Sequence, residues 1–182
     1  MLTGAAIPAG AQEDVPPVEL ADPQSRVTTR WGVGLGAGQQ LYADEDEGNG
    51  DSGTVRTVQL TYRAFLRQPD GGNWLFELGV ENAVSMTEPE TAPGVTQRVR
   101  MNGVFYRFSR FLGEHLYLGG RLGMSRVRGP ADAENLDLTV GLHSGWRFAS
   151  WLDASVQFVA ADPSGDPGGQ PLNIQGVLTA SF

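Results

Sequence analysis

Apolar and polar residues alternate along most of the chain, and this period of two constrains the fold more than any other feature. In one segment, for example, the apolar residues Phe76 and Leu78 lie on either side of Glu77. Successive side chains of a β-strand point to opposite faces of the sheet. Eight segments follow this pattern: 29–41, 56–67, 74–86, 97–110, 116–125, 136–148, 152–160 and 172–182. No segment of helical length has helical periodicity, so the sequence predicts eight β-strands, each with one apolar face.

The connections between these segments alternate in length. The long ones, rich in Gly, Pro, Asp and Glu, are 43–54, 87–96, 129–135 and 162–171. The short ones are 68–73, 110–115 and 149–151. An even number of antiparallel strands, with long loops at one end and short turns at the other, is the layout of a transmembrane β-barrel. The sequence therefore predicts an all-β protein, an eight-stranded antiparallel up-and-down transmembrane β-barrel over residues 26–182.

Composition excludes several other classes of protein. The 182 residues include no Cys, which excludes a disulfide scaffold, a thiolate metal site and a thiol nucleophile. The two His residues, His115 and His143, are far apart, which argues against a multi-histidine metal site, and we expect no cofactor. A net charge of −8 argues against a nucleic-acid partner. No apolar run approaches the roughly 18 residues that a membrane-spanning helix needs.

The polar face of each segment favours a barrel interior over a wetted surface, because it consists of Gly, Thr, Ser and Gln with isolated charges. Folding the chain about its short turns sets Arg63 opposite Glu77 and Arg147 opposite Asp153. The alternative is chance pairing of charges on an exposed sheet face. We expect a polar network in the lumen, made of Arg63, Glu77, Glu81, Arg100, Arg121, His143, Arg147 and Asp153.

Segment 97–110 is the least regular. Val99, Met101 and Phe105 follow the apolar face, which places Arg100 on the lumen side near Glu81. On this assignment three large apolar residues fall on the polar side: Val104, Tyr106 and Phe108.

The four tryptophans lie near the short-turn ends of the segments: Trp31, Trp74, Trp146 and Trp151. Aromatic residues at the ends of apolar strands are typical of the girdle at a membrane interface. The opposite rim offers only weaker candidates, Tyr42, Met86 and Met124.

The last segment ends on Phe182, preceded at every second position by Ala180, Leu178, Gly176 and Ile174. It resembles the C-terminal signal of bacterial outer-membrane barrels, an amphipathic last strand ending in Phe that the barrel-insertion machinery recognises. With the eight segments, the chain resembles the small outer-membrane barrels of the OmpA/OmpX type. The resemblance implies an insertion signal at Ile174, Leu178 and Phe182. It also implies the outer membrane of a Gram-negative bacterium, with short turns in the periplasm and long loops outside.

Two parts of the chain lie outside this pattern. Residues 1–11 end in a small-residue motif that predicts the remnant of a signal peptide, and the Pro-rich, acidic residues 12–25 predict a flexible periplasmic lead-in. In the first long loop, Asp44, Asp46 and Asp51 are weak candidates for calcium ligands. Because Arg56 occupies the position of the bidentate Glu of a calcium loop, we favour a solvated acidic loop and expect no metal site.

No catalytic site emerges from the sequence. His143 and Ser144 are adjacent in a strand and must point to opposite faces, so they cannot act together. We therefore expect a non-enzymatic barrel with a structural or interaction role that presents acidic loops outside the cell. Its expected partners are outer-membrane lipid and lipopolysaccharide, the insertion machinery and a possible envelope protein. The alternatives are a barrel enzyme that modifies lipid A and a soluble lipocalin-like carrier with its apolar face inside.

Overall fold

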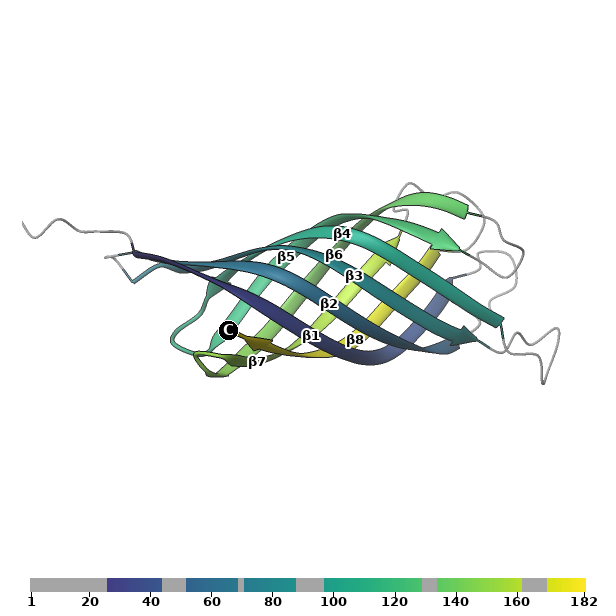
Figure 1. Cartoon of the computed structure of the whole chain (residues 1–182). Helices are drawn as coiled ribbons and strands as arrows, with labels where there is room; N and C mark the ends of the chain where they lie inside the picture. Colours follow the sequence, from purple (N-terminus) through teal and green to yellow (C-terminus); the bar gives the residue numbers. More distant parts are fainter. Residues whose placement is uncertain (1–25, 44–51, 69–70, 88–96, 129–133, 162–169) are drawn as a thin grey trace, which may run out of the picture.

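The structure, a computed structural model, is a closed barrel of eight antiparallel strands in sequence order (Figure 1). It describes residues 26–43, 52–68, 71–87, 97–128, 134–161 and 170–182. The strands are β1 (Arg26–Ala43), β2 (Ser52–Arg67), β3 (Asn73–Thr87), β4 (Gln97–Phe111), β5 (Leu116–Arg128), β6 (Glu134–Ala149), β7 (Leu152–Ala161) and β8 (Gln170–Ser181). Each strand pairs with the next and β8 pairs with β1, which confirms the predicted fold.

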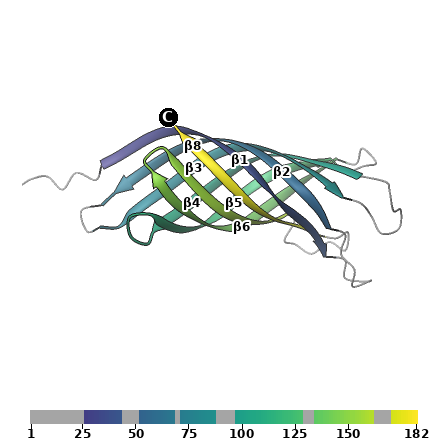
Figure 2. The same cartoon turned by 90° about the horizontal axis from the view of Figure 1, so that it is seen from below.

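The strands run obliquely around the barrel, and the C-terminus lies at the end where the short turns are (Figures 1 and 2). Two of these turns contain a glycine with a positive φ, Gly71 at 85° and Gly113 at 98°. A side chain is strained in this region of backbone conformation, so glycine is the residue that permits a tight turn there. Within the described residues, no helix is long and apolar enough to cross a membrane.

The apolar face of the strands points outward. Leu35, Leu78 and Leu138 are 62%, 63% and 53% exposed, whereas Arg63 and Glu77 are 1% and 2% exposed. A soluble carrier would have these faces the other way round. A belt of large apolar side chains around a polar interior requires an apolar environment outside the barrel.

The register of β4 corrects the sequence prediction for this strand. Val104 and Tyr106 face outward, 54% and 42% exposed, and Phe105 between them is 1% exposed. Arg100 is therefore exposed on the outer face, and its prediction as a lumen residue near Glu81 is wrong. The large apolar residues at the middle of β4 set the face that points outward, and the charged residues near its start follow them.

Small apolar clusters lie inside the barrel at both ends of the charged region. Near the long-loop end, the cluster consists of Val55, Ala83, Met101 and Ala161, with Val127 packed against it. Near the short-turn end, it consists of Leu75, Phe111 and Tyr117, with Phe65 packed against it. The charged interior between them is therefore bounded by apolar side chains along the barrel axis.

Candidate functional site: the charged lumen

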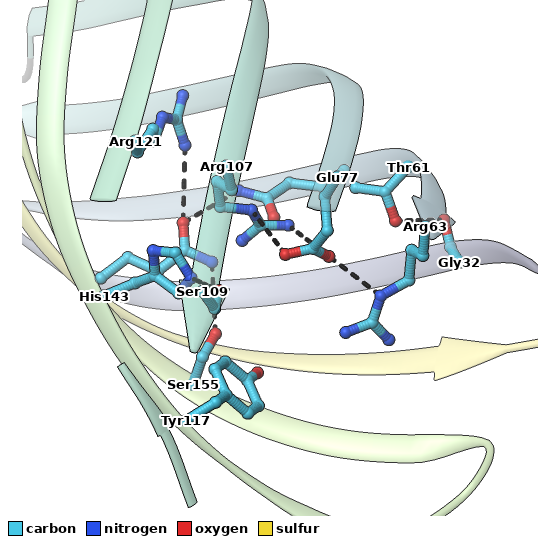
Figure 3. A network of polar contacts seen from close by, with 12 residues as sticks. Gly32, Thr61, Arg63, Glu77, Arg107, Ser109, Tyr117, Arg121, His143 and Ser155 are labelled. Atoms are coloured by element: carbon cyan, nitrogen blue, oxygen red, sulfur yellow. Dashed lines mark hydrogen bonds and ion pairs between the residues drawn. The ribbon is translucent and has the colours of Figure 1, made fainter. Parts of the chain in front are cut away.

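Arg63 of β2 joins two acidic residues from opposite sides of the barrel. Its Nε lies 2.9 Å from Glu77 Oε1 on the neighbouring strand β3. Its Nη1 donates to Asp153 Oδ2 of β7 at 2.6 Å and to Ser181 Oγ of β8 at 2.6 Å. The other carboxylate oxygen of Asp153 accepts a hydrogen bond from the Tyr117 hydroxyl at 2.8 Å. One guanidinium thus connects β2, β3, β7 and β8 across the lumen. Figure 3 shows its contact with Glu77.

Glu77 is shared by a second arginine, Arg107 of β4. The Nε of Arg107 lies 3.1 Å from Glu77 Oε2, and its Nη2 donates to Glu77 Oε1 at 3.2 Å. Both residues are 2% exposed. A buried carboxylate is costly unless its oxygens are paired, and here both oxygens of Glu77 face a guanidinium.

A third pair lies nearer the long-loop end. Arg121 of β5 binds Glu81 of β3 and donates from Nη1 to Gln157 Oε1 at 3.5 Å. Gln59 donates from Nε2 to both Glu81 Oε2 and Gln157 Oε1, each at 3.3 Å. The buried network therefore contains three arginines and three carboxylates, and its formal charges cancel: Arg63, Arg107, Arg121, Glu77, Glu81 and Asp153.

The Phe105 ring contacts two of these arginines. The guanidinium carbon of Arg107 lies 4.7 Å from its centroid, and that of Arg121 lies 4.4 Å away. The negative faces of an aromatic ring attract cations. The Phe105 ring therefore stabilises both buried guanidinium groups.

Glycines on the lumen face make room for the network. A Cβ added to Gly32 would lie 2.9 Å from Arg63 Cδ and 2.8 Å from Thr61 Oγ1. A Cβ at Gly145 would meet the phenol ring of Tyr117. These positions need glycine because large side chains from neighbouring strands already occupy the interior.

His143 lies in the lumen but does not bond Gln157, its register partner on β7. Its Nε2 is 2.7 Å from the hydroxyl oxygen of Ser109 on β4, and both residues are buried. A nucleophilic serine needs a histidine that a third group orients and a path for substrate. Among the described residues, no hydrogen-bond partner lies at His143 Nδ1. The Ser109–His143 pair therefore lacks the acid of a catalytic triad.

Arg147 also differs from the sequence prediction. It is the register partner of Asp153, but that carboxylate binds Arg63 and Tyr117. The Arg147 guanidinium instead stacks between the rings of Phe65 and Phe111, at 4.2 and 4.3 Å from their centroids. Of the eight predicted network residues, Arg147 is held by aromatic rings and Arg100 lies outside the barrel.

The four tryptophans lie at the short-turn end of the outer face. Trp31, Trp146 and Trp151 are 49%, 47% and 54% exposed. Trp74 is half-buried and stacks on Phe76 at 6.2 Å. The other described histidine, the exposed His115, stacks on Trp146 at 5.4 Å.

The end of the chain closes the barrel at this rim. Phe182 and Trp31 exchange two backbone hydrogen bonds, Trp31 N to Phe182 O at 3.1 Å and Phe182 N to Trp31 O at 2.9 Å. The Phe182 side chain is 75% exposed. Ile174 and Leu178 lie on the outer face of β8, the strand directly before Phe182, and Leu178 is 52% exposed.

No family model matches the sequence, and no curated protein matches it. Among solved structures, Neisserial surface protein A is similar, with a TM-score of 0.54 and 12% identity over 84% of this chain and 97% of that one. The Yersinia pestis outer membrane protein Ail, in a phospholipid bilayer nanodisc, matches with a TM-score of 0.50 and 12% identity over 85% of this chain and 100% of that one. The fold is that of a small outer-membrane β-barrel.

Several residues singled out from the sequence lie outside the part of the chain that the structure describes. These include the weak calcium candidates Asp44, Asp46 and Asp51, and the expected signal remnant and lead-in at 1–11 and 12–25. The sequence pattern missed Arg107 and Ser109, because segment 97–110 was assigned to the wrong faces. It also missed Tyr117 as a ligand of Asp153, since Tyr117 comes from a strand that is not adjacent to β7.

Proposed function

We propose that this chain is a non-enzymatic outer-membrane β-barrel of a Gram-negative bacterium with a structural or interaction role. The observation that supports it best is the neutral network of three arginines and three carboxylates inside an apolar exterior. Eight strands enclose only enough space for side chains. An interior filled by paired charges and bounded by apolar clusters favours a rigid anchor over a pore.

The proposed orientation of the barrel in the membrane supports an interaction role. In outer-membrane barrels the short turns lie in the periplasm and the longer loops face outward. On this orientation the acidic connections, with charges such as Glu45, Glu88 and Asp162, face the outside of the cell. Loops on a rigid scaffold carry binding functions disproportionately often. We propose lipopolysaccharide, through divalent ions, and an envelope protein as partners of these loops.

The rim with the tryptophans supports the periplasmic assignment of the short-turn end. Exposed indole rings are favoured at a membrane interface because they have an apolar body and a polar tip. We propose that Trp31, Trp74, Trp146 and Trp151 form this girdle. The exposed Phe182 beside Trp31 then remains accessible as the insertion signal.

Planar-bilayer recording of the purified, refolded chain tests the proposal. We expect no conductance above background for the wild type. The variant Arg121→Ala/Glu81→Ala removes one ion pair from the lumen and should give measurable conductance if that pair blocks the path. A wild type that conducts at the level of an open channel contradicts the anchor role.

The enzyme alternative has one specific candidate, the buried Ser109–His143 pair. We expect no labelling of Ser109 by a serine-directed fluorophosphonate and no change in lipid A acylation when the protein is present. Labelling that Ser109→Ala abolishes would favour an acyl-transfer or hydrolase function instead.

A further inference from the structure

Arginines gather on the outer face of the barrel at its long-loop end, on the same face that is apolar in the middle of the barrel. Arg56 of β2 and Arg98 and Arg100 of β4 are exposed there. Their neighbours along the chain, such as Val99 and Met101, are buried inside. The strand alternation therefore places these arginine side chains on the surface that continues the lipid-facing belt.

The strand register shows that these arginines begin where the apolar belt ends. Val80, Val104 and Met124 are register neighbours on β3, β4 and β5, and each is about half exposed. One step toward the long loops the corresponding residues are Asn82, Asn102 and Arg126, and the two asparagine side chains hydrogen-bond to each other. The next step contains Arg100 and Arg128, which are opposite each other, and Arg56 two strands away.

We call Arg56, Arg98, Arg100, Arg126 and Arg128 the arginine band. It is confined to β2, β4 and β5, on one side of the barrel. On β6 the outer face at the level of Met124 and Arg126 stays apolar, with Leu138 and Leu136 53% and 68% exposed. A charge that only marked the edge of the membrane would be distributed around the whole circumference.

The arginine band has few carboxylates of the same protein nearby with which to form ion pairs. Among the described outer-facing side chains of β2, β3, β4 and β5 at this end, none is acidic. Within the described residues, no ion pair to a carboxylate is found for Arg56, Arg98 or Arg100. Arg126 and Arg128 have interactions of their own in the protein, so the inference rests on the other three.

Spacing and depth together define the ligand. Neighbouring strands are about 4.8 Å apart and same-face residues of one strand are roughly 7 Å apart, so the backbone positions of the three arginines lie within roughly 12 Å of one another, a spacing that suits a headgroup with more than one phosphate. A guanidinium matches phosphate oxygens with two parallel hydrogen bonds. At the boundary of the apolar belt, the anions available are the phosphates of membrane lipids.

We infer that the arginine band binds the phosphate groups of a phosphorylated glycolipid in the outer leaflet. The inference rests on the proposed outer-membrane location and orientation, and it names the lipid chemistry that one side of this barrel selects. It also distinguishes this surface from the acidic loops, which would need a divalent ion to bind the same headgroup.

The test uses the full chain in bilayer nanodiscs and measures retention of added lipid by native mass spectrometry. The probes are lipid A with both phosphates, the same lipid after enzymatic dephosphorylation, phosphatidylglycerol, and inorganic phosphate as a competitor. We expect the wild type to bind the phosphorylated form at least about tenfold more tightly than the dephosphorylated form, with a preference that weakens at high salt.

The variant Arg56→Gln/Arg98→Gln/Arg100→Gln should remove this preference. The control Arg26→Gln/Arg67→Gln/Arg110→Gln removes the same charge from exposed arginines at the short-turn end and should keep it. Heat-dependent mobility on gels shows whether each variant is folded. Because the substituted arginines are exposed, we expect both variants to fold like the wild type.

Each outcome decides a separate point. Equal retention of both lipid A forms by an inserted wild type overturns the inference and leaves the outer-membrane proposal standing. Phosphatidylglycerol held as tightly as phosphorylated lipid A, or full displacement by inorganic phosphate, overturns the choice of glycolipid. A chain that does not insert into any bilayer contradicts the proposed location itself.

Discussion

At the scale of single residues, Glu77 has the most demanding environment in the barrel. Both its carboxylate oxygens face an arginine, and those two arginines come from the strands on either side of it. Removing one member of a buried ion pair leaves the other charge buried without a partner. The free-energy cost of that unpaired charge exceeds the net stabilisation that the intact pair provides.

We therefore predict that Glu77→Gln lowers the free energy of unfolding by about 3–5 kcal/mol, because Arg63 and Arg107 both lose a charged partner. Urea titration of the refolded protein in detergent or lipid vesicles measures the change. Glu114→Gln, on an exposed residue of a short turn, is the matched control and should shift stability by less than about 0.5 kcal/mol. Equal effects of the two variants would contradict the role of the network.

Glycine positions give a second residue-scale prediction. Gly32→Ala places a methyl group against Arg63 Cδ and Thr61 Oγ1, both under 3 Å away, so the network must shift. We expect slower and less complete refolding, and a loss of stability of about 1–3 kcal/mol. Gly176→Ala adds the same methyl group on the outer face, where the nearest atom is 3.9 Å away, and should have little effect. Far-UV circular dichroism during refolding follows both.

At the scale of elements, the alternation of apolar and polar residues correctly predicted the outward face of seven strands, but it predicted the wrong face for β4. The alternation in β4 changes along the strand: charged residues precede the apolar residues on the same outward face. A pattern based on charge places Arg100 inside, whereas the large residues Tyr106 and Phe108 decide the face because they occupy the middle of the membrane belt. The register of Arg63 with Glu77 followed from the short turn between β2 and β3.

Contacts between distant strands could not be predicted from the sequence. Hairpin register relates a strand only to its neighbour, but Tyr117 of β5 binds Asp153 of β7, and Arg63 of β2 reaches the same carboxylate. Two donors compete with the register partner Arg147, which is held by Phe65 and Phe111 instead. Which donor reaches Asp153 depends on the shape of the filled interior.

The final element gives the third prediction. Phe182→Ser leaves the backbone hydrogen bonds with Trp31 in place, so the stability of the folded barrel should change little. Recognition by the insertion machinery should decrease, because the variant removes the exposed aromatic side chain that we propose as its signal. We expect folding into vesicles that contain the machinery to slow several-fold, while spontaneous folding into detergent is unaffected. Phe148→Ser, on another exposed aromatic of the same rim, should leave both rates unchanged.

At the scale of the whole molecule, orientation in the membrane is the property from which the proposed roles follow. The absence of cysteine makes it simple to measure, because any introduced thiol is the only one in the chain. Two positions probe the two ends, Asn49 in the first long connection and the exposed Ser150 in the last short turn.

We predict that a membrane-impermeant maleimide labels Asn49→Cys in intact cells and labels Ser150→Cys only after the outer membrane is opened. The reason is that long loops face outward and short turns face the periplasm in this class of barrel. Labelling of Ser150→Cys in intact cells, with protection of Asn49→Cys, would reverse the orientation and place the arginine band in the inner leaflet.

The ion pair that joins Arg63 to Asp153 spans 90 positions of sequence and connects β2 to β7 across the lumen, past β1 and β8. A hairpin contains only one of these two residues, and an open sheet contains both without bringing them together, so a partly wound chain has charged groups with no partner. Their mutual attraction becomes available only when the first and last strands meet. Assembly should accordingly be cooperative, with incomplete sheets disfavoured electrostatically until the ring is complete.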